Sequence, residues 1–126
     1  MQRKGPATVT TFPSDAWVHL PVYCGKVALA KLPPSAYLKI QLPPGKYFFR
    51  SNDEQVVEVR LEEGQEVYLH MQIVEFKGGK VKGHLVLVDN EDGEEGIAHL
   101  RPLADKDVTK VSDANLAELK APPESK

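Results

Sequence analysis

The turn at Pro44 and Gly45 constrains the fold of this chain more than any other feature of its sequence. It stands between two segments of alternating apolar residues, Tyr37–Leu42 and Lys46–Ser51. Proline presets φ and glycine supplies the positive φ that a type II turn needs, so we expect the chain to reverse there without strain. The expected product is a β-hairpin with a two-residue loop. It would pair Leu42 with Tyr47 and Ile40 with Phe49 on a core face, and Lys39 with Arg50 on the opposite face.

The same alternation of short strand and turn continues through most of the chain. It is clearest where Val57, Val59 and Leu61 are separated by charged residues, a pattern typical of a half-buried strand. Seven to eight such strands predict an all-β fold, a small antiparallel β-sandwich of the prealbumin or immunoglobulin type with a flexible C-terminal tail. The expected strands are Ala7–Phe12, Trp17–Tyr23, Val27–Leu32, Tyr37–Leu42, Lys46–Ser51, Val57–Leu61, Glu66–Phe76 and Val81–Asp89. The expected core comprises Leu38, Ile40, Leu42, Tyr47, Phe49, Val57, Val59, Leu61, Leu69 and Met71.

Two strand registers are open at the Gly78-Gly79 turn. A plain two-residue loop sets Ile73 opposite His84, whereas a three-residue loop with a bulge sets Met71 opposite Leu85. We favour the bulged register because it gathers the apolar residues on one face, and burial of one face fixes register.

The length of 126 residues favours one domain. We expect a disordered N-terminal segment at residues 1–6, the β-sandwich at residues 7–104, and a tail at residues 105–126. Within the tail, Val108–Leu119 has weak helical spacing, but the composition is polar and two prolines, Pro122 and Pro123, stand near its end. The tail is therefore expected to be weakly helical or disordered, and dispensable for stability.

Charge and hydropathy exclude several classes of function. A net charge of -2 from 16 basic and 18 acidic residues gives no basic patch for nucleic acid. No run approaches the roughly 18 apolar residues of a membrane-spanning helix. The first residues do not lead into the apolar stretch of a signal peptide, although a mature chain without its leader would look the same. The lone cysteine, Cys24, cannot form an internal disulfide.

The histidines are the first candidates for a metal site. In the bulged register, His70 and His84 are diagonal neighbours on one sheet face, roughly 7–8 Å apart. Two imidazoles at that distance could share a zinc or copper ion, with Glu75 or a water completing the site. Exposed histidines are common on sheets, however, and His19 and His99 add no ligand spacing. We therefore expect no metal and no cofactor, and both rings should titrate near the ordinary pKa of roughly 6.5.

The acidic run Asp89–Glu95 suggests calcium, which takes oxygen ligands. EF-hand spacing fails, because that loop would need an acid where Val88 stands. A solvated loop that ends the sheet is the expectation. Gly96–Leu103 could then be a last strand or a helical turn, and the helix is slightly favoured by the glutamates near its start.

The remaining polar residues offer weaker chemistry. Cys24 lies beside a turn glycine but has no recognisable base, so a structural thiol is expected. Ser14, Ser35 and Ser51 lack the context of a nucleophile elbow. Lys77, Lys80 and Lys82 form a basic hairpin tip beside Phe76, which is more typical of a soluble sheet edge than of a phosphate or lipid-headgroup site. Trp17 and Tyr23 could form a sugar-stacking platform, but we expect them to be core and rim residues.

Four segments of the sequence carry a resemblance: Val22–Ala28, Ala36-Tyr37, Leu42–Tyr47 and Val57–Leu69. Together they resemble a bacterial family of small exported proteins, often lipoproteins, that is catalogued as a domain of unknown function. The similarity extends from about Ala7 to Leu103. It implies a transthyretin-like or carboxypeptidase-regulatory-like sandwich, export to the periplasm or cell envelope, and no catalytic residues. The resemblance implies membrane association only through a lipid anchor.

These features together predict a non-catalytic binding or structural module of the bacterial cell envelope, with another envelope protein as partner. The ligand and the oligomeric state stay open. One alternative is a small metal-binding protein or metal-dependent enzyme that uses the His70/His84 face. Another is a regulatory domain that packs on a partner enzyme, as transthyretin-like modules often do.

Overall fold

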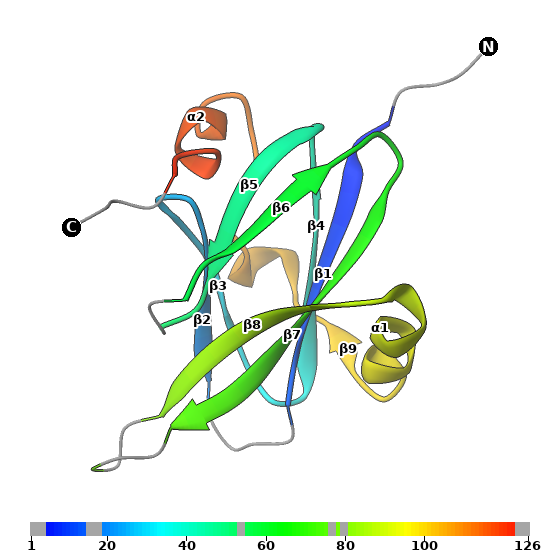
Figure 1. The fold of residues 1–126 in the computed structure, drawn as a ribbon, viewed down its shortest axis with the longest axis vertical. Coiled ribbons are helices and arrows are strands. Elements are labelled where there is room, and N and C mark those ends of the chain that lie inside the picture. The colour runs from blue at the N-terminus through cyan, green and yellow to red at the C-terminus, as the bar shows by residue number, and fades with distance from the viewer. Residues whose placement is uncertain (1–4, 15–18, 53–54, 76–77, 79–80, 123–126) are drawn as a thin grey trace.

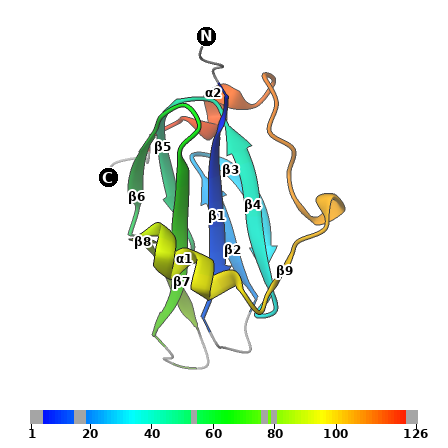
Figure 2. The ribbon, with the colours of Figure 1, turned by 90° about the vertical axis from the view of Figure 1, so that its right-hand side faces the viewer.

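The computed structural model describes residues 5–14, 19–52, 55–75, 78 and 81–122. Within them two open β-sheets stack face to face (Figures 1 and 2). The five-stranded sheet has the order β8-β7-β1-β4-β9, and the four-stranded sheet has the order β3-β2-β5-β6. The strands are β1 Ala7–Pro13, β2 Leu20–Cys24, β3 Val27–Leu32, β4 Ala36–Leu42, β5 Gly45–Arg50, β6 Val57–Leu61, β7 Glu66–Glu75, β8 Lys82–Val88 and β9 Arg101–Pro102, and the helices are α1 Asn90–Ile97, the 3-10 helix η2 Asp105–Asp107 and α2 Leu116–Leu119.

The five-stranded sheet is mixed, which corrects the expectation of a wholly antiparallel sandwich. Strand β1 runs parallel to β7, with Val9 opposite Val67, and β4 runs parallel to β9. The four-stranded sheet is antiparallel throughout. Turn signals identify strands that are neighbours in sequence, whereas β1 and β7 meet because both bury the same apolar face. That pairing leaves no local trace in the sequence.

The Pro44-Gly45 turn joins the two sheets and does not form the expected hairpin. Strand β4 pairs with β1, and β5 pairs with β2 and β6. Gly45 does have a positive φ, 151°. The predicted cross-strand pairs are therefore wrong: Leu42 lies opposite Ala7, Tyr47 opposite Val59, Lys39 opposite Thr10, and Arg50 opposite Tyr23.

The facing of the two strands was nevertheless predicted correctly, because alternation depends on which face is buried and not on the pairing partner. The predicted inward residues of β4 (Leu38, Ile40 and Leu42) and of β5 (Tyr47 and Phe49) are all buried. Nine of the ten expected core residues are buried, and Val57 is partly buried. The polar groups in this core are bonded: the Tyr47 hydroxyl donates to the Pro43 carbonyl at 2.7 Å, and the Ser51 hydroxyl donates to the Pro21 carbonyl at 2.7 Å.

The hairpin of β7 and β8 has the bulged register. Met71 lies opposite Leu85, and an irregularity falls between Ile73 and Glu75. Leu69 also lies opposite Leu87, as that register requires, although Leu87 is 53% exposed near the open edge. The preference for burying one apolar face is confirmed here as the property that fixed the register.

The acidic run forms a helix and not the expected solvated loop. The Asp89 side chain accepts a hydrogen bond from the Asp92 amide at 2.8 Å and so caps α1. The helix covers the outer face of the five-stranded sheet (Figure 2), with Gly93 against Tyr68 and Gly96 against Phe12. Gly96–Leu103, expected as strand or helix, is part of each: its start ends α1, and Arg101–Pro102 is β9.

The last part of the chain packs against the sandwich, where its composition suggested a dispensable tail. We call residues 103–121 the C-terminal strap. It runs along the side of the molecule at β4 and ends in α2 (Figure 2). The Thr109 amide donates to the Leu29 carbonyl at 2.8 Å, and the Lys26 amide donates to the Glu118 carbonyl at 2.9 Å. Leu119 is fully buried in the core, and Leu103, Val108, Val111 and Leu116 pack against it.

Candidate functional site

His70 lies on the outer face of β7 among close partners. Its Nε2 is 3.1 Å from Ser14 Oγ, and its ring stacks on Phe12 with 4.7 Å between centroids. The side chain is half-buried, and that burial lowers its pKa below the usual value. The expectation of an ordinary pKa is therefore wrong for His70. It assumed a ring standing free on a sheet face, whereas Phe12 of β1 and Ser14, just after β1, lie against it.

Ser14 and His70 are arranged as a structural pair. The Ser14 hydroxyl donates to the Met71 carbonyl at 2.7 Å. It is therefore an acceptor toward His70, which must carry its proton on Nε2. A general base needs the opposite tautomer, with Nε2 free to take the serine proton. The contact ties the end of β1 to β7.

His84 lies on the same face, opposite Gln72 and diagonal to His70, as the bulged register predicted. The side chain of Glu75, the expected third ligand, lies outside the described part. His19 and His99 are exposed, on the segments before β2 and after α1. Among the described residues, no group of three His, Cys, Asp or Glu side chains is placed to hold a metal ion.

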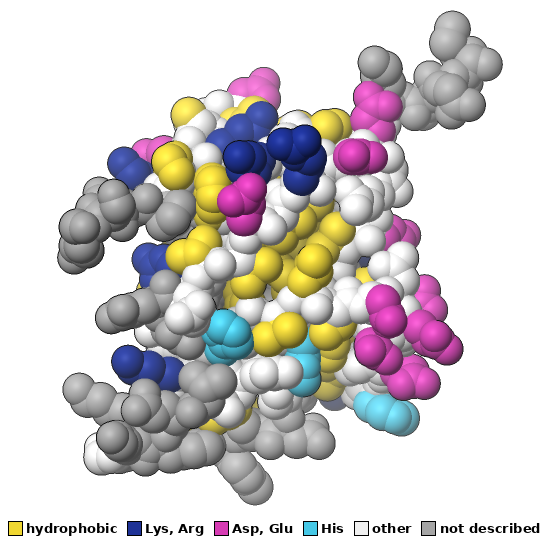
Figure 3. Space-filling model, in the orientation of Figure 1, with side chains coloured by type: hydrophobic (Ala, Val, Ile, Leu, Met, Phe, Trp, Pro, Cys, Tyr) yellow, Lys and Arg dark blue, Asp and Glu magenta, His cyan; other side chains and the backbone are white. Residues whose placement is uncertain are grey.

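The charged side chains of α1 point away from the sheet. Glu91, Asp92, Glu94 and Glu95 are exposed, and acidic side chains gather over this helix in Figure 3. They share the solvent side of the helix, but within the described part of the chain they form no group placed to hold a metal ion. At the proposed basic hairpin tip Lys82 is exposed on β8, and Lys77, Lys80 and Phe76 lie outside the described residues.

Cys24 is a buried structural thiol, as expected. It is fully enclosed, and its Sγ donates to the Leu119 carbonyl at 3.4 Å. Burial raises the pKa of this thiol to about 12, so the nucleophilic thiolate is disfavoured. Of the two candidates for a sugar-stacking platform, Tyr23 has its ring covered by the Arg50 guanidinium, 4.4 Å from the ring centroid. Trp17 lies outside the described residues.

Only the first part of the outer edge of β4 pairs with another strand. The Arg101 amide donates to the Ser35 carbonyl at 3.3 Å, and the Leu103 amide donates to the Tyr37 carbonyl at 2.9 Å. Odd-numbered residues of β4 thus direct their main chain away from β1, because the direction alternates along a strand. Beyond β9 the next two are Lys39 and Gln41. Within the described chain, no segment pairs with β4 at these positions on that side.

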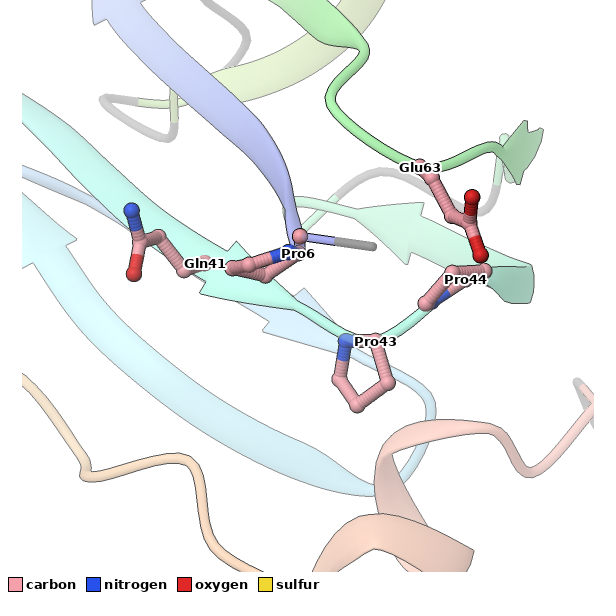
Figure 4. Close-up of a pocket in the computed structure, with 6 residues that line it drawn as sticks. Pro6, Gln41, Pro43, Pro44 and Glu63 are labelled. Carbon is pink, nitrogen blue, oxygen red and sulfur yellow. The ribbon is translucent and has the colours of Figure 1, made fainter. Parts of the chain in front are cut away.

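Two hollows flank this free edge, and Gln41 lines both. The first, the proline hollow, has a volume of about 370 Å³. In Figure 4 the rings of Pro6, Pro43 and Pro44 surround it, and the Glu63 side chain extends toward Pro44. The second, the strap hollow, has a volume of about 200 Å³ and lies between Ile40 and the C-terminal strap. The strap residues that line it are Asp105, Val108, Thr109, Lys110 and Val111.

We call the free edge and the two hollows together the β4 groove. Sequence reasoning missed it, because the hairpin expected at Pro44-Gly45 would have covered β4 with β5. Two signals were available. The prolines after Leu42 cannot donate to a strand ladder, which is typical of a sheet edge. The weak helical spacing of Val108–Leu119 indicated a segment that could pack on the sandwich.

The sequence was also compared with known proteins. No protein-family model matches the chain, and no curated protein matches it.

Proposed function

We propose that the protein is a non-catalytic binding module whose binding surface is the β4 groove. One observation carries the proposal: a strand edge with main-chain donors and acceptors at Lys39 and Gln41 lies between two largely apolar hollows. Binding sites typically combine apolar walls with a few polar groups that fix orientation.

The state of the candidate nucleophiles supports a non-catalytic role. Ser14 donates its proton to a main-chain carbonyl and not to His70. Cys24 is enclosed beneath Leu119, and its pKa is raised to about 12. Both groups therefore hold the sandwich together, and neither is activated for attack.

The strand order supports a sandwich of the prealbumin type. One sheet contains β4-β1-β7-β8 and the other β3-β2-β5-β6, with β1 and β7 parallel, which is the arrangement of transthyretin-like sandwiches. With the sequence resemblance, this leads us to propose a module of the bacterial cell envelope with another envelope protein as partner. The net charge of -2 supports a protein partner over nucleic acid.

A fragment screen by NMR tests this proposal without assuming the ligand. The ¹⁵N-labelled protein is titrated with a library of small aromatic and amide compounds. We expect the hits to shift the amides of Lys39, Gln41 and Val111. Hits that gather on the outer face at His70, with the β4 groove unaffected, would contradict the proposal.

A pair of variants sharpens the test. Gly5 lines the proline hollow, and a Cβ there would meet no atom within 4 Å, so Gly5→Tyr adds a ring beside this hollow without a clash at its Cβ. We expect it to weaken fragment binding in the proline hollow and to leave binding in the strap hollow unchanged. The control is Ala98→Tyr, which adds the same ring at an exposed position after α1 and should leave binding unchanged.

A further inference from the structure

We infer that the β4 groove binds an extended peptide of a partner protein, which adds to the five-stranded sheet as a strand beside Lys39 and Gln41. This inference rests on the proposed function and specifies the chemistry of its ligand.

The chain itself shows that this edge accepts a strand. β9 pairs with Ala36 and Tyr37 at the same edge of β4, but it ends at Pro102, and the strap then turns away into η2. Strand β4 continues for five residues beyond Tyr37, to Leu42. An added peptide would continue the line of β9 and bond to the main chain of Lys39 and Gln41. Addition of a strand to an open edge is a common mode of peptide recognition.

The hollows define which side chains such a peptide would carry. Alternate side chains of a strand point to opposite sides. One set would enter the strap hollow, where Ile40, Val108 and Val111 provide apolar contacts. The other set would lie toward the proline hollow, beside the ring of Pro43. The expected ligand therefore has apolar residues at alternate positions.

The groove carries charges of both signs. Glu63 lines the proline hollow, Asp105 and Lys110 line the strap hollow, and Lys39 is exposed on the edge strand itself. These charges favour neither an acidic nor a basic peptide, so the alternating apolar residues define the ligand.

The test is a scan of peptide N-methylation, because methylation removes one main-chain donor and leaves the protein intact. A displayed library of short random peptides is selected against the full chain, and the best binder is methylated at each position in turn. A strand added to β4 directs every second amide toward it. We expect methylation at those positions to weaken binding by about tenfold or more, and methylation at the others to have little effect.

Two protein variants locate the site. Gln41→Pro removes the edge amide, whereas the control Glu94→Ala changes an exposed side chain on α1, outside the β4 groove. Binding should be lost in the first and retained in the second. Selection of no binder, uniform tolerance of N-methylation, or full binding to Gln41→Pro would overturn the inference. If the fragments still bind at the β4 groove, the proposed function survives that failure. Concentration-dependent dimerisation that Gln41→Pro abolishes would instead identify a second copy of this chain as the occupant.

Discussion

At the scale of single residues, His70 shows how neighbours change the chemistry of a side chain. The alternation of β7 placed it on a sheet face, where a sequence reader expects a solvated ring. The face is covered in part by Phe12, which stacks on the ring at 4.7 Å. Ser14 then fixes the position of the hydrogen on Nε2. Burial disfavours the charged imidazolium, so the pKa of His70 is lowered.

This burial predicts a pH dependence of stability. Above roughly pH 6.5, His70 is neutral in both the folded and the unfolded chain. As the pH falls below that value, the unfolded chain takes up a proton before the folded chain does, so the free energy of unfolding should decrease until the folded pKa is reached. His70→Gln should lack this component. The measurements are an NMR titration of His70 and urea unfolding at several pH values. A His70 pKa at or above that of the unfolded chain would contradict the described packing. In the same NMR experiment, stoichiometric zinc should shift the resonances of neither His70 nor His84.

At the scale of elements, α1 is held by close contact of its glycines with the sheet. Gly93 and Gly96 are three positions apart and share one helix face. A Cβ on either would overlap an aromatic ring, of Tyr68 or of Phe12. From the sequence alone each glycine looks like a turn residue, since glycine lowers helix propensity. Their role depends on two rings that lie far away in the sequence, which explains why the helix was missed.

Gly93→Ala tests this packing against intrinsic helix propensity. Propensity alone predicts a gain of about 1 kcal/mol in an exposed helix. We expect instead a loss of about 1–3 kcal/mol, because the new methyl group must displace α1 from Tyr68. The control is Glu94→Ala on the exposed face of the same helix, which should change stability by less than about 0.5 kcal/mol. Chemical denaturation measures both, and a stabilised Gly93→Ala would show that α1 does not rest on the sheet.

At the scale of the whole molecule, local patterns predicted the layers and long-range contacts determined their assembly. The inward residues of β4 and β5 and the register of β7 with β8 were predicted correctly, since each depends on burying one face. The placement of β4 and β5 in different sheets was not predicted, because the same alternation of apolar residues is compatible with a hairpin and with a connection between two sheets. The β4 groove is the product of that difference and of the strap, whose few apolar residues looked too sparse to pack.

Removal of the strap should therefore destabilise the protein. A chain that ends at Leu103 loses the buried side chain of Leu119 and the bonds from Thr109 to β3. Deletion of one buried leucine side chain alone typically costs about 2–5 kcal/mol. We expect a large fall in the melting temperature, and reaction of Cys24 with a thiol reagent, since Leu119 no longer covers it. A melting temperature within a few degrees of that of the full chain would contradict this account and show that the tail is dispensable for stability. Leu119→Ala measures the contribution of the Leu119 side chain to stability apart from the rest of the strap. Glu118→Ala, at an exposed neighbouring position, is its control.

The central claim is that the outer edge of β4 is open beyond β9, and hydrogen exchange tests it most directly. Amide exchange is measured by NMR on the ¹⁵N-labelled protein at native pH. The amides of Leu38 and Ile40 point toward β1 and should be protected, whereas those of Lys39 and Gln41 point to the free edge and should exchange rapidly. This alternation along one strand is the result that the structure predicts. Equal protection at all four amides would mean that another segment covers the edge, and the β4 groove would not exist as described.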